Sequence, residues 1–295
     1  MNGILNVNKP SGLTSHDVVK RIRKLAGGRV GHAGTLDPNA TGVLLICVGR
    51  ATRVAEYLMA SEKVYDAVVR LGTETDTYDV DGRVVETRRV SVSRAEIEAA
   101  LEGFRGEIEQ VPPAYSALKR NGQPLYKLAR RGIEVERSAR HVEISELTLI
   151  ECKIPDVTLR IRCSPGTYVR SLAHDLGRVL GCGAHLASLE RTASGNFTSA
   201  DAIALDDAEA AASEARLVEL LQPLDAALGM YPSATLNEQE VADVRCGRML
   251  SHEIAPADPE GLCCAYDRDG ELVAIIRFDA RKRRWCPHKV FADRS

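Results

Sequence analysis

The chain has 295 residues, 44% of them hydrophobic and 27% charged, with 39 Lys and Arg against 41 Asp and Glu. This composition is ordinary for a folded protein, and the length is compatible with one large and one small domain. No apolar run reaches eighteen residues and the N-terminus lacks the regions of a signal peptide, which excludes a membrane helix and predicts a cytoplasmic protein.

The formal net charge of −2 conceals a segregated charge distribution. Residues 1–35, 115–141 and 277–295 each carry six or seven Lys and Arg against one or two acids, whereas acids gather in 201–219. Each basic stretch alone could be a solvated helix face. Their segregation favours a surface that follows the phosphates of a nucleic acid.

Eight cysteines are scattered along the chain without a Cys-x-x-Cys pair or nearby histidines at ligand spacing. This pattern indicates reduced, mostly packed thiols and gives no sign of a structural metal site.

The N-terminal residues predict a strand followed by a helix. Ile4, Leu5 and Val7 form a short apolar strand, and a helix capped by Thr14 or Ser15 runs to the pair Gly27-Gly28. The outer face of this helix is basic.

The stretch 29–53 combines a tight loop with a buried strand. Its first half is rich in glycine and contains Asp37-Pro38, and residues 42–48 are a continuous apolar strand. Pro38 fixes its own φ and restricts Asp37, so the loop can hold one carboxylate rigidly at the wall of a cleft. An ordinary Asp-Pro turn is the simpler alternative for such a dipeptide. A short helix over 51–60 follows.

The middle of the chain alternates strands and helices. Residues 64–71 alternate as a strand with Tyr65 on its apolar side, which alone would indicate a core tyrosine. An acidic, Thr-rich loop over 72–82 follows; it lacks the ligand positions of an EF-hand. Ser93 and Glu96 form a capping box for a helix that reaches Phe104.

Residues 111–141 predict a basic hairpin or loop-helix insert in which tyrosines stand among Lys and Arg, a mixture suited to unstacked bases and phosphates. A half-exposed strand over 157–163 leads to a helix with Val169, Leu172, Ala173, Leu176 and Val179 inward. Arg170 stands in its first turn, where the helix dipole disfavours a cation, so a nearby anion is expected.

The C-terminal part changes in composition. Residues 206–230 predict an acidic, Ala-rich helical region that ends at Gly229. Beyond it, 231–295 predict a capped helix from Asn237 and short strands around the turn 268–270, a small β-rich unit.

Four segments together resemble one family. Residues 31–44, GHAGTLDPNATGVL, resemble the catalytic motif of the bacterial tRNA pseudouridine-55 synthases, the TruB family, and residues 63–82, 163–177 and 181–195 match in the same order. The resemblance implies an α+β fold with a central mixed, mainly antiparallel sheet flanked by helices. It also implies a catalytic domain over 1–230, with a flexible thumb at about 111–141, and a PUA-like RNA-binding domain over 231–295.

The resemblance also implies roles for particular residues. Asp37 would be the essential carboxylate, Arg170 its salt-bridge partner, and Tyr65 the residue stacked on the target base. Ten further residues would bind substrate: Lys9, His32, Arg53, Asp79, Lys119, Arg130, Arg131, Tyr168, Leu189 and Arg191.

The implied reaction detaches uracil from C1′ of the ribose, turns it and rejoins it through C5, which needs neither cofactor nor metal. The RNA would be the T-arm stem-loop of tRNA, and the enzyme a monomer without an obligate protein partner. Covalent attack at C1′ and a glycal route remain equal alternatives.

Three other functions are considered: the catalytic subunit of a guide-RNA-dependent particle, a non-catalytic tRNA-binding or folding module, and a glycosidase. The last would take its second acid from Asp76, Asp79 or Asp81.

Overall fold

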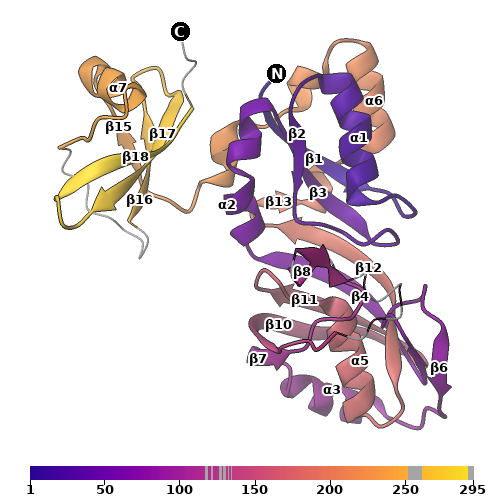
Figure 1. Cartoon of the computed structure of the whole chain (residues 1–295). Coiled ribbons are helices and arrows are strands. Elements are labelled where there is room, and N and C mark those ends of the chain that lie inside the picture. The colour runs from indigo at the N-terminus through magenta and orange to yellow at the C-terminus, as the bar shows by residue number, and fades with distance from the viewer. Residues whose placement is uncertain are drawn as a thin grey trace.

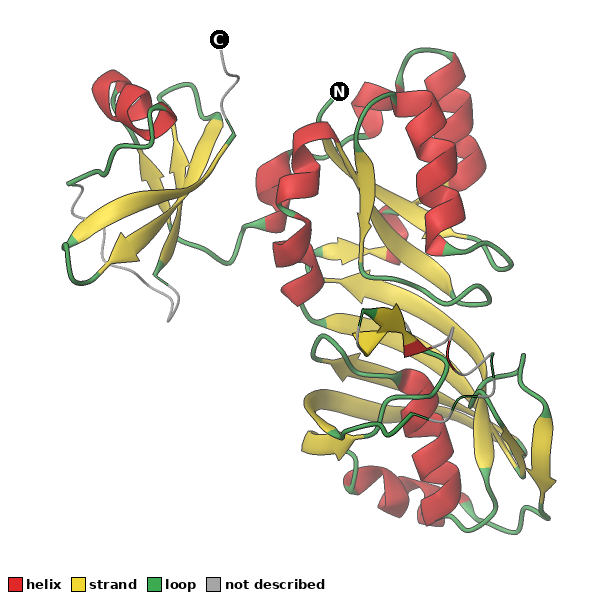
Figure 2. Cartoon of the chain, viewed as in Figure 1, coloured by secondary structure: helices red, strands yellow, loops and turns green. Residues whose placement is uncertain are grey.

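The computed structural model describes residues 1–116, 119–120, 122–125, 128, 131, 133, 135–251 and 261–291. They form one large sheet with helices packed against it and one small sheet that carries helix α7 (Figures 1 and 2). Two short hairpins stand apart from these sheets: β5 (Thr73–Thr75) with β6 (Val84–Thr87), and β8 (Lys119–Arg120) with β9 (Gln123–Pro124).

The large sheet has the order β14-β1-β3-β12-β4-β11-β10-β7, with β2 paired to β3 and β13 to β12. Only the β1–β14 and β3–β12 pairings are parallel. The sheet is therefore mixed and mainly antiparallel, as predicted. Its strands are β1 (Gly3–Lys9), β2 (Val30–Ala33), β3 (Thr41–Val48), β4 (Lys63–Leu71), β7 (Gly106–Gln110), β10 (Arg140–Lys153), β11 (Asp156–Cys163), β12 (Ala184–Ser194), β13 (Phe197–Thr198) and β14 (Ile203–Ala204).

β12 joins two halves of this sheet, because it pairs with β3 on one side and with β4 on the other. Helices α1 (Ser15–Ala26) and α6 (Leu205–Ser213) pack on the first half, and α3 (Arg94–Glu102) and α5 (Val169–Val179) on the second. Tyr65 and Leu189 pack against the cores of both halves. The junction of the halves is thus where residues of both can meet.

Both predicted helix caps in the large domain are present. Thr14 and Asp17 form a capping box on α1, which stops at Gly27 with φ +67°, and Ser93 and Glu96 form one on α3. One predicted core residue is wrong: Val179 at the end of α5 is 63% exposed. The helix ends there, so its last residue extends past the sheet that covers Leu172 and Leu176.

Other boundaries also differ from prediction. Residues 30–33 were predicted within a turn, but they form β2, whose backbone pairs with Leu45–Val48 of β3. The helix expected over 51–60 is a 3-10 turn, η1 (Gly49–Arg53), followed by α2 (Ala55–Ala60). The acidic helical region is broken after α6, where Ala215 takes a left-handed φ of +58°. Short turns follow: η3 (Leu217–Leu220) and η4 (Leu224–Ala227); η2 (Ser199–Asp201) precedes β14.

The small sheet has the order β15-β16-β17-β18 and carries α7. Asn237 caps α7 and two strands match the predicted ones, whereas β15 and β18 were missed. Phe291, just after β18, is buried in a cluster shared with Leu58 of α2, so the small sheet packs against α2 and the first half of the large sheet. The elements are β15 (Ser233–Thr235), α7 (Glu238–Arg245), β16 (Leu262–Tyr266), β17 (Leu272–Asp279) and β18 (Arg284–Val290).

Within the described residues, every helix is too short or too polar to cross a membrane.

Candidate active site

Asp37 lies on the loop between β2 and β3, and this loop is clamped from behind by the N-terminal segment. Ser15 Oγ accepts a hydrogen bond from the backbone N–H of Leu36 at 2.9 Å and donates one to the Leu36 carbonyl at 3.0 Å. The Pro38 carbonyl accepts from Lys9 Nζ and from the Gly12 N–H, both at 2.9 Å. The residues on both sides of Asp37 are therefore fixed, which holds its carboxylate in one place.

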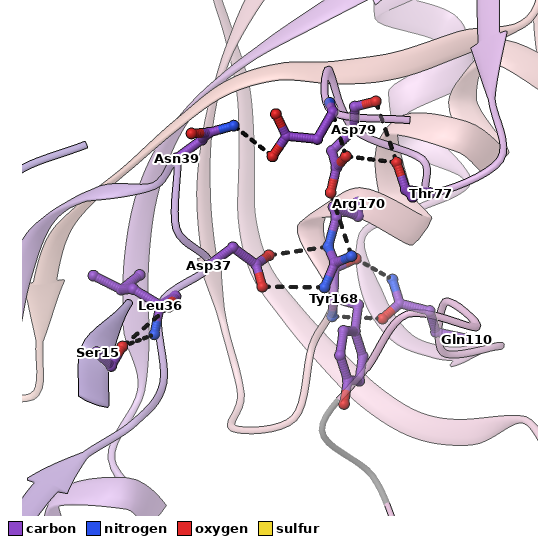
Figure 3. A network of polar contacts seen from close by, with 10 residues as sticks. Ser15, Leu36, Asp37, Asn39, Thr77, Asp79, Gln110, Tyr168 and Arg170 are labelled. Carbon is purple, nitrogen blue, oxygen red and sulfur yellow. Dashed lines mark hydrogen bonds and ion pairs between the residues drawn. The ribbon is translucent and has the colours of Figure 1, made fainter. Parts of the chain in front are cut away.

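Arg170 meets that carboxylate with two nitrogens. Its Nε is 3.0 Å from Asp37 Oδ2 and its Nη2 is 3.2 Å from Oδ1, a bidentate pair between the loop and the first turn of α5 (Figure 3). The Arg170 side chain is only 8% exposed, whereas that of Asp37 is 42% exposed. The pair thus presents the carboxylate, and not the guanidinium, to solvent. It also supplies the anion that Arg170 requires at a helix N-terminus.

Burial raises the pKa of the Asp37 carboxyl above its ordinary value of 3.8, while the Arg170 guanidinium acts in the opposite direction. Burial also lowers the pKa of the Lys9 ammonium to about 8, and its attraction to Asp37 partly offsets this. Arg170 therefore favours the ionised carboxylate, and the cost of removing it from water opposes this with the larger effect on the pKa.

Asp79 contributes a second carboxylate to the same guanidinium, with Oδ2 3.4 Å from Arg170 Nη1. Its Oδ1 accepts from Thr77 Oγ1 at 2.6 Å and from the Asp81 N–H at 3.1 Å. Tyr78 beside it has a left-handed φ of +65° and stacks on His174 of α5, with ring centroids 3.9 Å apart. This loop therefore contacts two successive turns of α5, through Asp79 at Arg170 and through Tyr78 at His174.

A polar contact also links the two loops that carry the acids. Asn39 Nδ2 donates to Asp81 Oδ2 at 2.6 Å. Asn39 lies two residues after Asp37 on the same loop (Figure 3). Asp76 instead faces Arg83, with Oδ2 3.2 Å from Nε.

Tyr65 and Leu189 come from neighbouring strands at the centre of the sheet. Tyr65 of β4 is paired with Arg191 of β12, and Leu189 is paired with Ala67. Both side chains are half-buried. Burial raises the pKa of the Tyr65 hydroxyl, which is therefore neutral at ordinary pH. The fold brings an aromatic and an aliphatic side chain together at the junction that also holds Asp37.

Lys9 and Arg191 were expected to contact substrate, but their side chains are 0% and 1% exposed. Lys9 Nζ donates to the carbonyls of Pro10, Leu13 and Pro38. Arg191 donates to the carbonyls of Val43 at 2.7 Å and Gly34 at 3.0 Å. Both cations thus hold the backbone around the Asp37 loop, and an RNA contact would require them to leave these partners.

The other expected substrate residues are spread around this centre. His32 on β2 is partly exposed, with a buried Nδ1 that has no hydrogen-bond partner among the described residues; burial lowers the pKa of its ring. Tyr168 is half-buried at the start of α5. Arg53 donates instead to the Val290 carbonyl beside the small sheet.

The expected insert residues fall where the structure is only partly described. The backbone of Lys119 belongs to β8, and Arg131 is exposed in a turn. Arg130 and the Lys119 side chain lie outside the described residues.

Sequence reasoning missed two residues that hold this site. Ser15 was recognised only as a possible helix cap, although its hydroxyl binds Leu36. Gln110, at the end of β7, makes two hydrogen bonds to the backbone of Tyr168. Nothing local in the sequence marks either role, because both partners are distant along the chain. Within the described ranges, no three His, Cys, Asp or Glu side chains are grouped to hold a metal ion.

Two known domain families match most of the chain. Residues 20–169 match the family described as TruB family pseudouridylate synthase (N terminal domain), and residues 170–229 match the tRNA pseudouridylate synthase B C-terminal domain. The chain belongs to the TruB family of pseudouridine synthases. The two matches cover the large sheet apart from β1, and both residues of the Asp37–Arg170 pair.

Individual TruB relatives extend the match. The chain is 46% identical over 256 residues to tRNA pseudouridine synthase B of Clostridium kluyveri, covering 86% of each protein. It is 44% identical to tRNA pseudouridine synthase B of Dehalococcoides mccartyi (strain CBDB1), covering all of this chain and 98% of the relative.

Solved structures share the fold over the whole chain. A structure of an H/ACA RNP bound to a substrate RNA containing 2'-deoxyuridine aligns with a TM-score of 0.76 at 28% identity, covering 99% of this chain and 86% of the other. A Cbf5-Nop10-Gar1 complex aligns with a TM-score of 0.75 at 28% identity, covering 99% and 85%. These similarities confirm the predicted fold class.

Proposed function

We propose that this chain is a stand-alone tRNA pseudouridine synthase that isomerises uridine 55 of the T loop, with Asp37 as the catalytic carboxylate. The observation that carries the proposal is the bidentate Asp37–Arg170 pair, in which the carboxylate keeps its exposed face. Membership of the TruB family and the relatives named tRNA pseudouridine synthase B support the substrate class. The cytoplasm is the expected location.

The chemistry requires an ionised carboxylate at the ribose. Asp37 would either attack C1′ or remove the proton at C2′, and Arg170 would hold it ionised and oriented in both routes. Because the pair is already formed, little reorganisation is needed when the sugar arrives.

The target base must leave its stack to reach this carboxylate, at a cost of about a few kcal/mol. Tyr65 and Leu189 would receive it, since they offer a flat and an aliphatic surface at the same junction. Asp79 would shape the pocket while supporting Arg170. The neutral Tyr65 hydroxyl would be available for proton transfer.

The RNA around the base would be held by the remaining groups. His32 would lie at the gap left in the T loop by the flipped nucleotide. The basic residues Lys119, Arg130 and Arg131 would follow phosphates, and the small sheet over 231–295 would act as a PUA-like RNA-binding domain for the acceptor stem.

Tritium release from a T-arm stem-loop labelled at C5 of uridine tests the proposal, because the new carbon–carbon bond expels that hydrogen. Wild-type enzyme alone should release tritium, whereas Asp37→Asn should not, while its affinity for the stem-loop stays nearly unchanged. Release by Asp37→Asn at the wild-type rate would disprove the assignment of Asp37. A strong loss of binding in that variant would contradict its purely chemical role.

A second candidate is the catalytic subunit of a guide-dependent particle, favoured by the similarity to the H/ACA RNP and Cbf5 structures over 99% of the chain. The same assay separates the two. Release by the purified chain without guide RNA or partner protein supports the stand-alone enzyme, and release only with them supports the particle.

A further inference from the structure

The first turn of α5, which carries Arg170, is fixed from outside the helix. Its N-cap residue Tyr168 makes no side-chain capping bond, and the first turn contains no acid to balance the cation. A helix start of this kind is not stabilised by its own sequence. Its position must therefore come from tertiary contacts.

Gln110 supplies two of these contacts through one side chain. Its Oε1 accepts from the Tyr168 N–H at 2.7 Å, and its Nε2 donates to the Tyr168 carbonyl at 3.1 Å (Figure 3). The residue is 3% exposed. The amide thus pairs with both backbone groups of Tyr168 as a neighbouring strand would, at a site shielded from water.

A second hydrogen bond joins the same two segments. Ser171 Oγ donates to the Val111 carbonyl at 2.7 Å. Tyr168 and Ser171 enclose Arg170 in sequence, and both are bonded to the consecutive residues Gln110 and Val111. At this point the chain leaves β7 for the basic insert. Arg170 therefore stands between two residues that are hydrogen-bonded to the end of β7 and to the first residue of the insert.

We propose that Gln110 is a positioning residue for the isomerisation, acting through Tyr168 to hold Arg170 in bidentate contact with Asp37. The inference rests on the proposed function and deepens it. Gln110 hydrogen-bonds to the backbone of Tyr168 and to neither Asp37 nor Asp79. Its effect is on the geometry of the pair, and a displacement of about 1 Å in a reacting group can cost about a hundredfold in rate.

The decisive variant is Gln110→Met, which keeps the length of the side chain and removes both hydrogen bonds. Gln239→Met, on the exposed surface of α7, is the matched control, because the stem-loop lacks the acceptor stem that is assigned to this part of the chain. Single-turnover tritium release and stem-loop binding are measured for both, together with the pH profile of the rate. Thermal melting establishes that each variant is folded.

For Gln110→Met we expect a rate about 10- to 100-fold below wild type, with the Kd for the stem-loop within about threefold. The acid limb of the rate profile should move to higher pH, because a displaced Arg170 stabilises the Asp37 carboxylate less. A purely structural residue would not move that limb. Gln239→Met should behave as wild type.

A folded Gln110→Met enzyme with the wild-type rate and acid limb overturns the inference, as does a loss explained entirely by weaker binding. If Gln110→Met does not fold, Ser171→Ala removes the second connection and should lower the rate in the same direction, and an unchanged rate then overturns it. No release by wild type would instead overturn the proposed function, so the two failures are distinguishable.

Discussion

In the proposed reaction Asp37 has to be ionised in order to act at the ribose, and its surroundings oppose this. Burial raises the pKa of its carboxyl above 3.8, and Arg170 only partly restores the charged form. Since the active species is the carboxylate, the rate should fall as the pH falls through this raised pKa. Single-turnover tritium release between about pH 4 and pH 8 should therefore show an acid limb above the ordinary Asp value.

Arg170→Ala provides the comparison, because it removes the cation that favours ionisation. Its acid limb should lie at higher pH than that of wild type, and its rate should be lower at every pH. An acid limb at the same pH in both enzymes would mean that another group controls the profile.

Ser15 is the residue whose loss should loosen the Asp37 loop most directly. Ser15→Ala leaves the N–H and the carbonyl of Leu36 without their partner in a buried place, which costs about 1–3 kcal/mol of stability. We expect a lower melting temperature and slower turnover. Ser145→Ala, which removes an exposed hydroxyl bonded to Glu62, is the control and should change stability by about 0.5 kcal/mol or less. Equal effects of the two substitutions on stability and turnover would refute the role of Ser15 in holding the Asp37 loop.

At the residue scale the sequence predicted charges better than contacts. Arg170 in the first turn of a helix predicted a nearby anion, and Asp37 is that anion. The resemblance placed Lys9 and Arg191 at the substrate, yet both bind backbone carbonyls. The carbonyls of Pro38, Val43 and Gly34 are distant in sequence from the cations that bind them, so no local pattern could reveal these bonds.

At the scale of elements, β3 and β12 approach so closely that one position admits only glycine. A Cβ on Gly42 would lie 2.2 Å from the Arg191 carbonyl oxygen, and its φ is +92°. Gly42→Ala should therefore destabilise the protein by more than about 4 kcal/mol, or prevent folding, as measured by chemical denaturation.

Gly28→Ala separates backbone strain from the clash. Gly28 has φ +72°, but nothing lies within 4 Å of the Cβ it would gain. It should cost only about 1–2 kcal/mol. Comparable destabilisation in the two variants would show that the left-handed φ alone, and not the close approach of the strands, determines the free-energy cost of adding a Cβ.

Helices with a clear periodic pattern of apolar residues were predicted well. Short strands that form only by pairing with a neighbouring strand were not. Capping boxes and apolar stripes marked α1 and α3 because their signals are local. β2 was assigned to a turn because its four residues become a strand only by pairing with β3. The small strands β15 and β18 were missed for the same reason.

At the scale of the whole molecule, the small sheet is fixed to the large one beside α2. Arg50 and Arg53 donate to the carbonyls of Phe291 and Val290, and Lys289 Nζ donates to the Arg53 carbonyl at 2.6 Å. Arg53, which the resemblance placed near RNA, and Lys289 of the basic tail thus serve partly in joining the two sheets. The first residue of the basic insert, Val111, is instead hydrogen-bonded to Ser171 of α5.

The insert should therefore supply most of the salt-dependent affinity for the T arm. Replacing Lys119, Arg130 and Arg131 by Ala should weaken stem-loop binding and lower the slope of log K against log salt concentration by about 0.7–0.9 for each phosphate that the protein no longer neutralises. Binding titrations at several salt concentrations measure this. Arg94→Ala, which removes a cation paired with Glu98 on α3, is the control and should leave the slope unchanged.

An unchanged slope in the triple variant would mean that the insert does not touch phosphates. The other two basic stretches, residues 1–35 and 277–295, would then be the next to neutralise, because each carries a large excess of cations.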